Sequence, residues 1–271
     1  SKNLLKTKTD VLVVGVNEGK VLNADAEKVD KATNGSIKEL IKRGEFEAKI
    51  GQTAYIATND GSSADRIFLI GCGKSSSKLD SENMEKISMS ITMCLTSKKS
   101  ATGIVSLPAM KYASSDHNDA ALLQKLGCSL ESKAYTYDAK LNKKNKTINY
   151  LKKVSVLINS KESLAKLRKG LKTGHAIGQG MNVAKDLANL PGNVCTPSYL
   201  ATSSKSAAKN YKKLSCRVFG EKEMKKMGMD CLLSVGNGSA EESKLISMNY
   251  QGGKKGDKPY AIVGKGITFD T

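Results

Sequence analysis

The first half of the chain alternates between short apolar runs and longer stretches with helical periodicity. The apolar runs are rich in valine and isoleucine and are bounded by turn residues, which is typical of β-strands. A stretch at 81–95 starts with Ser-Glu-Asn, as a helix amino terminus commonly does, and repeats apolar residues at helical spacing. The predicted strands are residues 11–16, 53–57, 66–71, 103–107 and 153–158. Strands that alternate with helices predict an α/β fold for residues 1–160.

A long helix is expected next, over residues 163–190. Leu164, Leu167 and Leu171 are three and four residues apart, and Ile177 and Met181 continue the apolar stripe. The pattern ends at the Pro-Gly pair 191–192. We interpret residues 161–190 as a connector helix between two α/β units.

A second unit is predicted over residues 191–271. Thr196 followed by Pro197 is a favourable helix start, because a hydroxyl caps the helix and proline suits its first position. The expected elements are a helix at 197–212, a strand at 216–219, a helix at 221–227 ended by Gly228, and strands at 245–250 and 260–264. The last of these strands leads directly into Gly264 and Lys265.

The net charge of +18 introduces nucleic-acid binding as an alternative function. The excess comes almost entirely from lysine, since the chain has only four arginines, at positions 43, 66, 168 and 217. Lysine is a hydrated point charge, whereas base recognition favours the planar fork of arginine. The composition therefore leaves two interpretations, a solvated lysine surface or sequence-independent contact with phosphates.

The six cysteines and the hydropathy pattern bear on the cellular compartment. The cysteines are scattered without a CxxC pair, which favours reduced thiols over a thiolate metal site. No apolar run approaches 18 residues, and the amino-terminal stretch reads as a first strand, not as a signal peptide. We expect a cytoplasmic protein without a membrane-spanning segment.

The stretch 261–271, AIVGKGITFDT, combines a strand-like run with a lysine between two glycines. Glycines on both sides allow a tight turn, which could bring Lys265 and Asp270 to one point. Two interpretations follow: a salt bridge, or a metal site in which the carboxylate bridges two divalent cations. An amine binds metal only when it is neutral, and two adjacent dications would favour that state by repulsion.

Four segments together resemble the leucine aminopeptidase (cytosol aminopeptidase) family of two-metal exopeptidases. They are DLANLPGNVCTP (186–197), EMKKMGMDCLLSVGNGS (223–239), YQGG (250–253) followed by Lys258-Pro259, and VGKGITFDT (263–271). Residues 180–271 carry this resemblance densely. Residues 1–160 are similar to the family only in layout, and the resemblance implies an α/β domain of macro-domain type there.

The resemblance implies an enzyme that releases amino-terminal residues, leucine-like ones preferentially, from peptides. A metal-activated hydroxide would attack the peptide. Lys265 matches the family's lysine ligand at the more weakly held cation, and Asp270 matches the bridging aspartate. Two divalent ions are implied, Zn²⁺ or Mn²⁺, with Mg²⁺ or Co²⁺ as alternatives. The resemblance also implies a homohexamer.

The remaining apparatus of the family has no counterpart in this sequence. It includes a catalytic lysine, a further aspartate ligand, and an Asn-Thr-Asp-Ala-Glu-Gly-Arg signature. Two side chains cannot hold a pair of divalent ions, so we expect a chain that is truncated within its catalytic domain and inactive alone, with no catalytic residue of its own.

Other candidates are weaker. His175 is interpreted as a surface or packing residue and His117 as a solvated loop residue, and two histidines exclude an all-imidazole zinc site. Residues 71–74, Gly-Cys-Gly-Lys, lack the span of a phosphate-binding loop and read as a strand-to-helix turn. Cys72 has no evident base partner, and residues 236–239 read as a turn. An ADP-ribose-binding role for residues 1–160 rests on fold analogy alone.

Overall fold

The computed structural model describes residues 4–19, 21–57, 61–97, 99–137 and 150–268. The chain divides into two compact units, residues 1–183 and 184–271. Each unit is described by itself.

Unit 1 is built on a five-stranded sheet in the order β2-β3-β1-β5-β7, in which only β2 runs antiparallel. All five strands predicted from the sequence are present. Their bounds are β1 Thr9–Glu18, β2 Thr53–Ile56, β3 Ala64–Lys74, β5 Thr102–Leu107 and β7 Lys153–Ile158. Two further strands of two residues each, β4 Lys78–Leu79 and β6 Lys111–Tyr112, form a small separate parallel pair.

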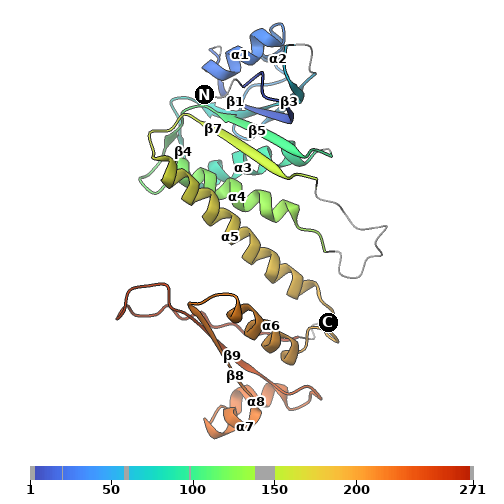
Figure 1. The fold of residues 1–271 in the computed structure, drawn as a ribbon, viewed down its shortest axis with the longest axis vertical. Coiled ribbons are helices and arrows are strands. Elements are labelled where there is room, and N and C mark those ends of the chain that lie inside the picture. The colour runs from blue at the N-terminus through green and yellow to red at the C-terminus, as the bar shows by residue number, and fades with distance from the viewer. Residues whose placement is uncertain (1–3, 20, 58–60, 98, 138–149, 269–271) are drawn as a thin grey trace. The chain divides into compact units, whose positions relative to one another are not determined.

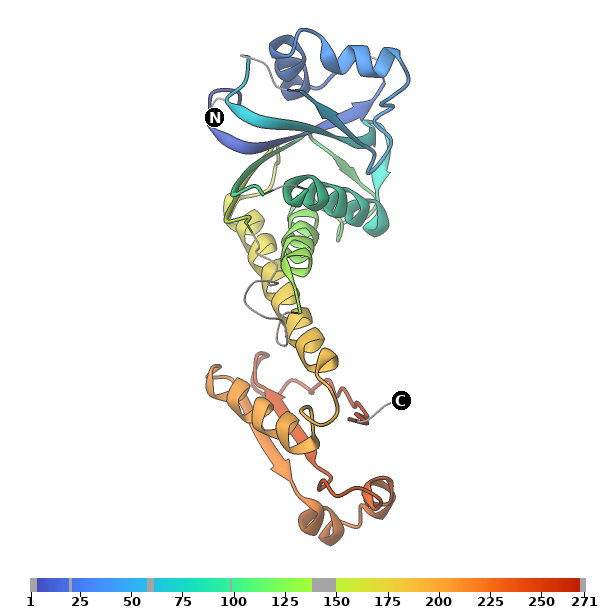
Figure 2. The same cartoon turned by 90° about the vertical axis from the view of Figure 1, so that its right-hand side faces the viewer.

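Both faces of the sheet are covered by helices, which explains the continuous apolar composition of its central strand. Along β1, Val11 and Val13 belong to the core on one face, whereas Leu12 and Val14 belong to the core on the other. The helices α1 Ala24–Ala32 and α2 Ser36–Lys42 cover the second face, and α3 Ser81–Thr96 and α4 Asp119–Ala134 cover the first (Figures 1 and 2). The predicted helix at 81–95 is thus confirmed as α3, and the side chain of Asp80 caps it by accepting the N–H of Asn83.

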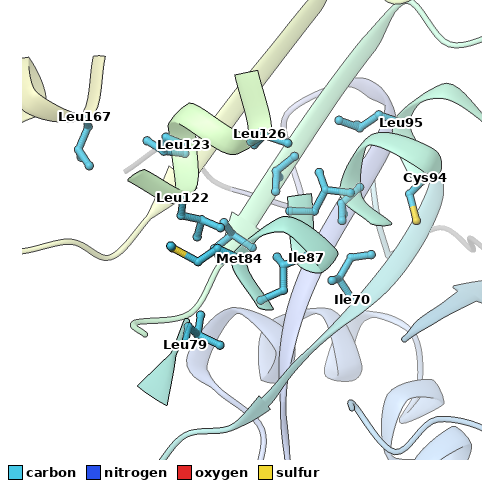
Figure 3. Close-up of a cluster of buried hydrophobic side chains, with 14 of the residues drawn as sticks. Ile70, Leu79, Met84, Ile87, Cys94, Leu95, Leu122, Leu123, Leu126 and Leu167 are labelled. Carbon is cyan, nitrogen blue, oxygen red and sulfur yellow. The ribbon is translucent and has the colours of Figure 1, made fainter. Parts of the chain in front are cut away.

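The core between the sheet and helices α3 and α4 is dense with leucine and isoleucine (Figure 3). Met84 and Ile87 of α3 and Leu122 and Leu126 of α4 are almost fully buried there. Each such side chain stabilises the fold by about 1.5–3 kcal/mol relative to exposure. Leu167, from the next helix along the chain, closes the same cluster.

The Gly-Cys-Gly-Lys stretch at 71–74 lies within β3, so the predicted strand-to-helix turn was wrong. The stretch forms an irregular strand end instead. A Cβ at Gly71 would lie 1.9 Å from the carbonyl oxygen of Lys49, so only glycine lets segment 48–52 cross here. The N–H of Gly73 donates to Ala48 O (3.0 Å), and Gly73 has a φ of +72°. This local pairing explains both glycines without a ligand.

Helix α5, Leu164–Asn189, confirms the long predicted helix, and its amino-terminal part packs closely on α4. Gly170, Gly174 and Gly178 are spaced four residues apart, are buried, and lie against the α4 side. A Cβ at Gly170 would lie 2.2 Å from Ala120 O. The spacing of these glycines therefore lets two helix backbones approach each other directly.

After the end of α5, the described part of unit 2 contains three helices and two strands. They are α6 Pro197–Lys209, β8 Leu214–Phe219, α7 Glu221–Lys226, α8 Asp230–Gly236 and β9 Leu245–Tyr250. The predicted elements at 197–212, 216–219, 221–227 and 245–250 are confirmed with slightly different ends, and Thr196 caps α6 as expected. Strands β8 and β9 form an antiparallel pair. Within the described part of this unit, only Cys195, Ala201 and Met224 are buried apolar residues.

Helix length and hydropathy also bear on membrane insertion. Across the described ranges, no helix combines the length and the apolar character needed to cross a bilayer.

Candidate metal centre

Lys265 lies in a segment that follows β9 and has no regular secondary structure. The segment begins with a turn in which the N–H of Lys254 donates to Asp257 Oδ2 (2.8 Å) and Gly256 adopts a φ of +97°. Beyond this turn the chain carries Lys265 with its side chain exposed. A Cβ at either Gly264 or Gly266 would meet nothing within 4 Å, so the space on both sides of the lysine is open.

The predicted strand at 260–264 was wrong for the described structure. Tyr260 is 100% exposed, Ile262 97% and Val263 95%, so the segment has no packing partner. β9, the nearest strand along the chain, is hydrogen-bonded to β8. A strand exists only where a neighbour accepts and donates its backbone hydrogen bonds, and β-type composition alone does not provide one.

Asp270 lies outside the described residues, so its position relative to Lys265 is not given by the structure. The predicted convergence of these two side chains stays a prediction. The turn that would produce it needs the Gly264 and Gly266 positions to be free of side-chain crowding, and both are.

The described residues do not by themselves form a metal centre. No group of three or more His, Cys, Asp or Glu side chains is close enough to hold an ion in the part of the chain that the structure describes. An amine and one carboxylate are too few donors for two divalent cations, each of which takes four or more ligands. Lys265 and Asp270 therefore supply at most part of such a site.

The two histidines differ in solvent exposure and in the partners of their side chains. His175 is exposed on α5, and its Nδ1 lies 2.5 Å from Glu131 Oε1 of α4, which fits the predicted surface role. His117 is half-buried and its Nδ1 is enclosed, with no hydrogen-bond partner among the described atoms. His117 therefore lies in a loop, as predicted, but its ring is only partly exposed to solvent.

Cys72 is unsuited to nucleophilic chemistry, as predicted. Its side chain is 3% exposed, and burial raises the pKa of the thiol to about 12. Residues 236–239 form the predicted turn, in which the N–H of Ser239 donates to Gly236 O (2.9 Å).

Two family models match the chain. The model described as the cytosol aminopeptidase family, N-terminal domain, matches residues 13–144. The model described as the cytosol aminopeptidase family, catalytic domain, matches residues 182–271.

Curated relatives match along almost the whole chain. A probable cytosol aminopeptidase of Alkalilimnicola ehrlichii is 38% identical over 259 residues, which is 96% of this chain and 52% of that protein. The cytosol aminopeptidase of Pseudomonas aeruginosa is 36% identical over 265 residues, 97% of this chain and 52% of that protein. The chain thus spans about half the length of the curated relatives it matches.

Solved structures share the fold. A mutant of tomato leucine aminopeptidase matches with a TM-score of 0.78 and 19% identity, covering 98% of this chain and 53% of that one. The bottromycin maturation enzyme BotP in complex with Mn matches with a TM-score of 0.64 and 20% identity, covering 89% of this chain and 45% of that one. What these structures share with the chain is the mixed α/β arrangement of helices and strands.

Proposed function

The chain belongs to the cytosol aminopeptidase family, and we propose that it serves in the removal of amino-terminal residues, leucine-like ones preferentially, from peptides. One observation carries this proposal: relatives named cytosol aminopeptidases are 36–38% identical to it along 96–97% of its length. The match runs through both family models, so it does not depend on one short motif.

The proposed role of Lys265 and Asp270 is to bind divalent metal. The proposal rests on the family match over residues 182–271, on the exposed position of Lys265, and on the open space at the glycines on either side of it. Zn²⁺ or Mn²⁺ is proposed as the metal, with Mg²⁺ or Co²⁺ as alternatives. A divalent ion in such a site would polarise a peptide carbonyl and activate water. Since the described residues form no site of three ligands, we further propose that residues 1–271 alone are inactive.

A chimera tests the proposal. Residues 1–271 replace the matching part of the Alkalilimnicola ehrlichii relative, and hydrolysis of a leucyl chromogenic substrate is measured with Mn²⁺ or Zn²⁺. We expect an active chimera and no activity from residues 1–271 alone. Lys265→Ala and Asp270→Ala should each lower activity at least about a hundredfold, the upper end of the loss seen when support for a metal is removed.

A control variant and a measurement of metal content separate a loss of metal binding from a general loss of activity. Lys258→Ala removes a nearby exposed lysine with the same side chain, and should leave activity within about twofold, as surface changes generally do. Metal content, measured by mass spectrometry of the purified chimera, should fall in the Lys265 and Asp270 variants but not in the control. Full activity and full metal content in both variants would contradict the assigned roles.

Three further properties belong to the proposal. We propose a homohexamer, a cytoplasmic location, and a division into residues 1–160, a connector at 161–190, and a catalytic part from 191 onward. The name of the relatives, cytosol aminopeptidase, supports the location. Nucleic-acid binding is kept as a second proposed activity because of the net charge of +18.

A further inference from the structure

The amino-terminal ends of four parallel strands meet at one edge of the sheet in unit 1, and basic residues lie at every one of them. Strands β3, β1, β5 and β7 are hydrogen-bonded neighbours that run in the same direction. We call this edge, with its six cations, the basic edge. Its members are Lys6 and Lys8 before β1, Arg66 near the start of β3, Lys99 before β5, and Lys152 and Lys153 at the start of β7.

Backbone hydrogen bonds hold these segments side by side. The N–H of Ser63, before β3, donates to Leu5 O (2.8 Å), which ties the start of β3 to the segment that carries Lys6 and Lys8. On the other side of β1, the N–H groups of Lys152 and Lys153 both donate to Ala101 O (2.8 and 3.1 Å). The cations therefore form a continuous row along the edge, a juxtaposition that no short sequence window contains.

The row is linked across β1 by Asp10. The N–H groups of Ala101 and Thr102 donate to Asp10 Oδ2, at 2.5 and 3.1 Å. This carboxylate is thus engaged by backbone donors of the neighbouring strand. The other carboxylate at this edge, among the described residues, is Asp65. Two carboxylates against six cations leave a clear positive excess.

The lysines of the basic edge also differ from many lysines elsewhere in unit 1. Eight of those others lie within 4.0 Å of a carboxylate, for example Lys31 with Glu27 and Lys86 with Glu82. In the described ranges, the five lysines of the basic edge form no ion pair, and all five are exposed. The Nζ of Lys99 lies 5.5 Å from the centre of the Tyr150 ring. Their charge is therefore directed to solvent and available to a polyanion.

We propose that the basic edge binds the phosphate backbone of duplex nucleic acid without regard to sequence. Lysine supplies point charges suited to phosphates, whereas base readout needs the arginine fork. Arg66, the one arginine at the edge, is half-buried, and its Nη2 donates to Ser100 Oγ (2.7 Å). This inference locates the nucleic-acid binding proposed above, and it is independent of the aminopeptidase activity.

The test compares two variants that remove equal charge. One carries Gln at the edge positions Lys6, Lys8, Lys152 and Lys153. The control carries Gln at four other exposed lysines of unit 1 that form no ion pair among the described residues: Lys78, Lys111, Lys169 and Lys172. Binding of a short mixed-sequence DNA duplex is followed by fluorescence anisotropy over a range of KCl concentrations. Circular dichroism checks that both variants fold.

For the wild-type chain we expect binding at low salt that weakens steeply with KCl. Each lost phosphate contact should lower the slope of log K against log salt by about 0.9, so the edge variant should lose a slope of up to about 3.6 and at least about tenfold in affinity. The control should keep most of the affinity and slope. As a second measurement, DNA should protect the edge lysines of the wild-type chain from acetylation, read by mass spectrometry.

Three results would overturn the inference. Equal losses in the edge variant and the control would show that general charge, and not this edge, binds DNA. Unchanged acetylation of the edge lysines in saturating DNA would show that the contact lies elsewhere. No binding by the wild-type chain at low salt would remove nucleic-acid binding altogether, while leaving the peptidase proposal untouched.

Discussion

Gly174 on α5 lies against the backbone of Gln124 on α4, so closely that a Cβ at Gly174 would be 1.9 Å from the Gln124 carbonyl oxygen. Gly180, six residues further along the same helix, would place its Cβ in open space. The same substitution at the two positions should therefore have opposite effects.

Gly174→Ala should destabilise unit 1 by about 1–3 kcal/mol, because the added methyl group forces the helices apart. Gly180→Ala should stabilise it by up to about 1 kcal/mol, because alanine has the higher helix propensity. Urea unfolding followed by circular dichroism measures both. A stabilised Gly174→Ala protein would mean that α4 and α5 are not in contact through this row of glycines.

Gly228→Ala should destabilise α7 although Gly228 has no close neighbour. The residue has a φ of +71°, its N–H donates to Lys225 O, and the next N–H donates to Met224 O, which is the Schellman arrangement at a helix end. A left-handed conformation costs an alanine about 1–2 kcal/mol. Hydrogen exchange of the α7 amides should speed up accordingly, and unchanged exchange would contradict the conformation.

Asp10→Asn should lower stability at neutral pH and have a smaller effect in acid. The N–H groups of Ala101 and Thr102 hold the pKa of Asp10 below its ordinary value of 3.8. Because the folded-state pKa is the lower one, ionised Asp10 stabilises the fold above pH 3.8, and that contribution is lost as the pH falls through the lowered pKa. Urea midpoints of both proteins from pH 7 to pH 2 should converge at the acid end. A difference independent of pH would show that the charge plays no part.

Cys72 and Cys94 should resist alkylation in the folded protein. Burial raises the pKa of both thiols to about 12, so almost no reactive thiolate is present near pH 8. Cys231 is exposed and serves as the matched control in the same sample. Iodoacetamide labelling read by mass spectrometry should modify Cys231 first and the other two only in denaturant. Early labelling of Cys72 would indicate that the sheet opens locally.

The central strands could be predicted from sequence because strands buried on both faces consist almost entirely of apolar residues. Val11 to Val14 are apolar at every position, since helices cover both faces of β1. Residues 260–264 have similar composition and form no strand, since strand formation depends on a neighbour that sequence pattern cannot supply. Strands β4 and β6 were not predicted, because two residues carry no periodicity.

The proposed functional residues divide in the same way. Lys265 was proposed from a local motif, which is a signal that a short stretch of sequence can carry. The basic edge has no local motif, because its lysines are brought together by strands that are far apart in the sequence. A pattern could still have indicated it: a lysine at the start of β1, β5 and β7 or within the three residues before it.

The solvent-exposed apolar run at residues 260–263 has a consequence for synthesis on the ribosome. Once residues 1–183 have emerged, both core clusters of unit 1 are complete and can close. The stretch from Tyr260 to Val263 emerges later. In the part of unit 2 that the structure describes, its apolar side chains are not buried: Tyr260, Ile262 and Val263 are 95–100% exposed. Nascent chains that have exposed this stretch should be prone to aggregate and should bind chaperones that recognise extended apolar peptide.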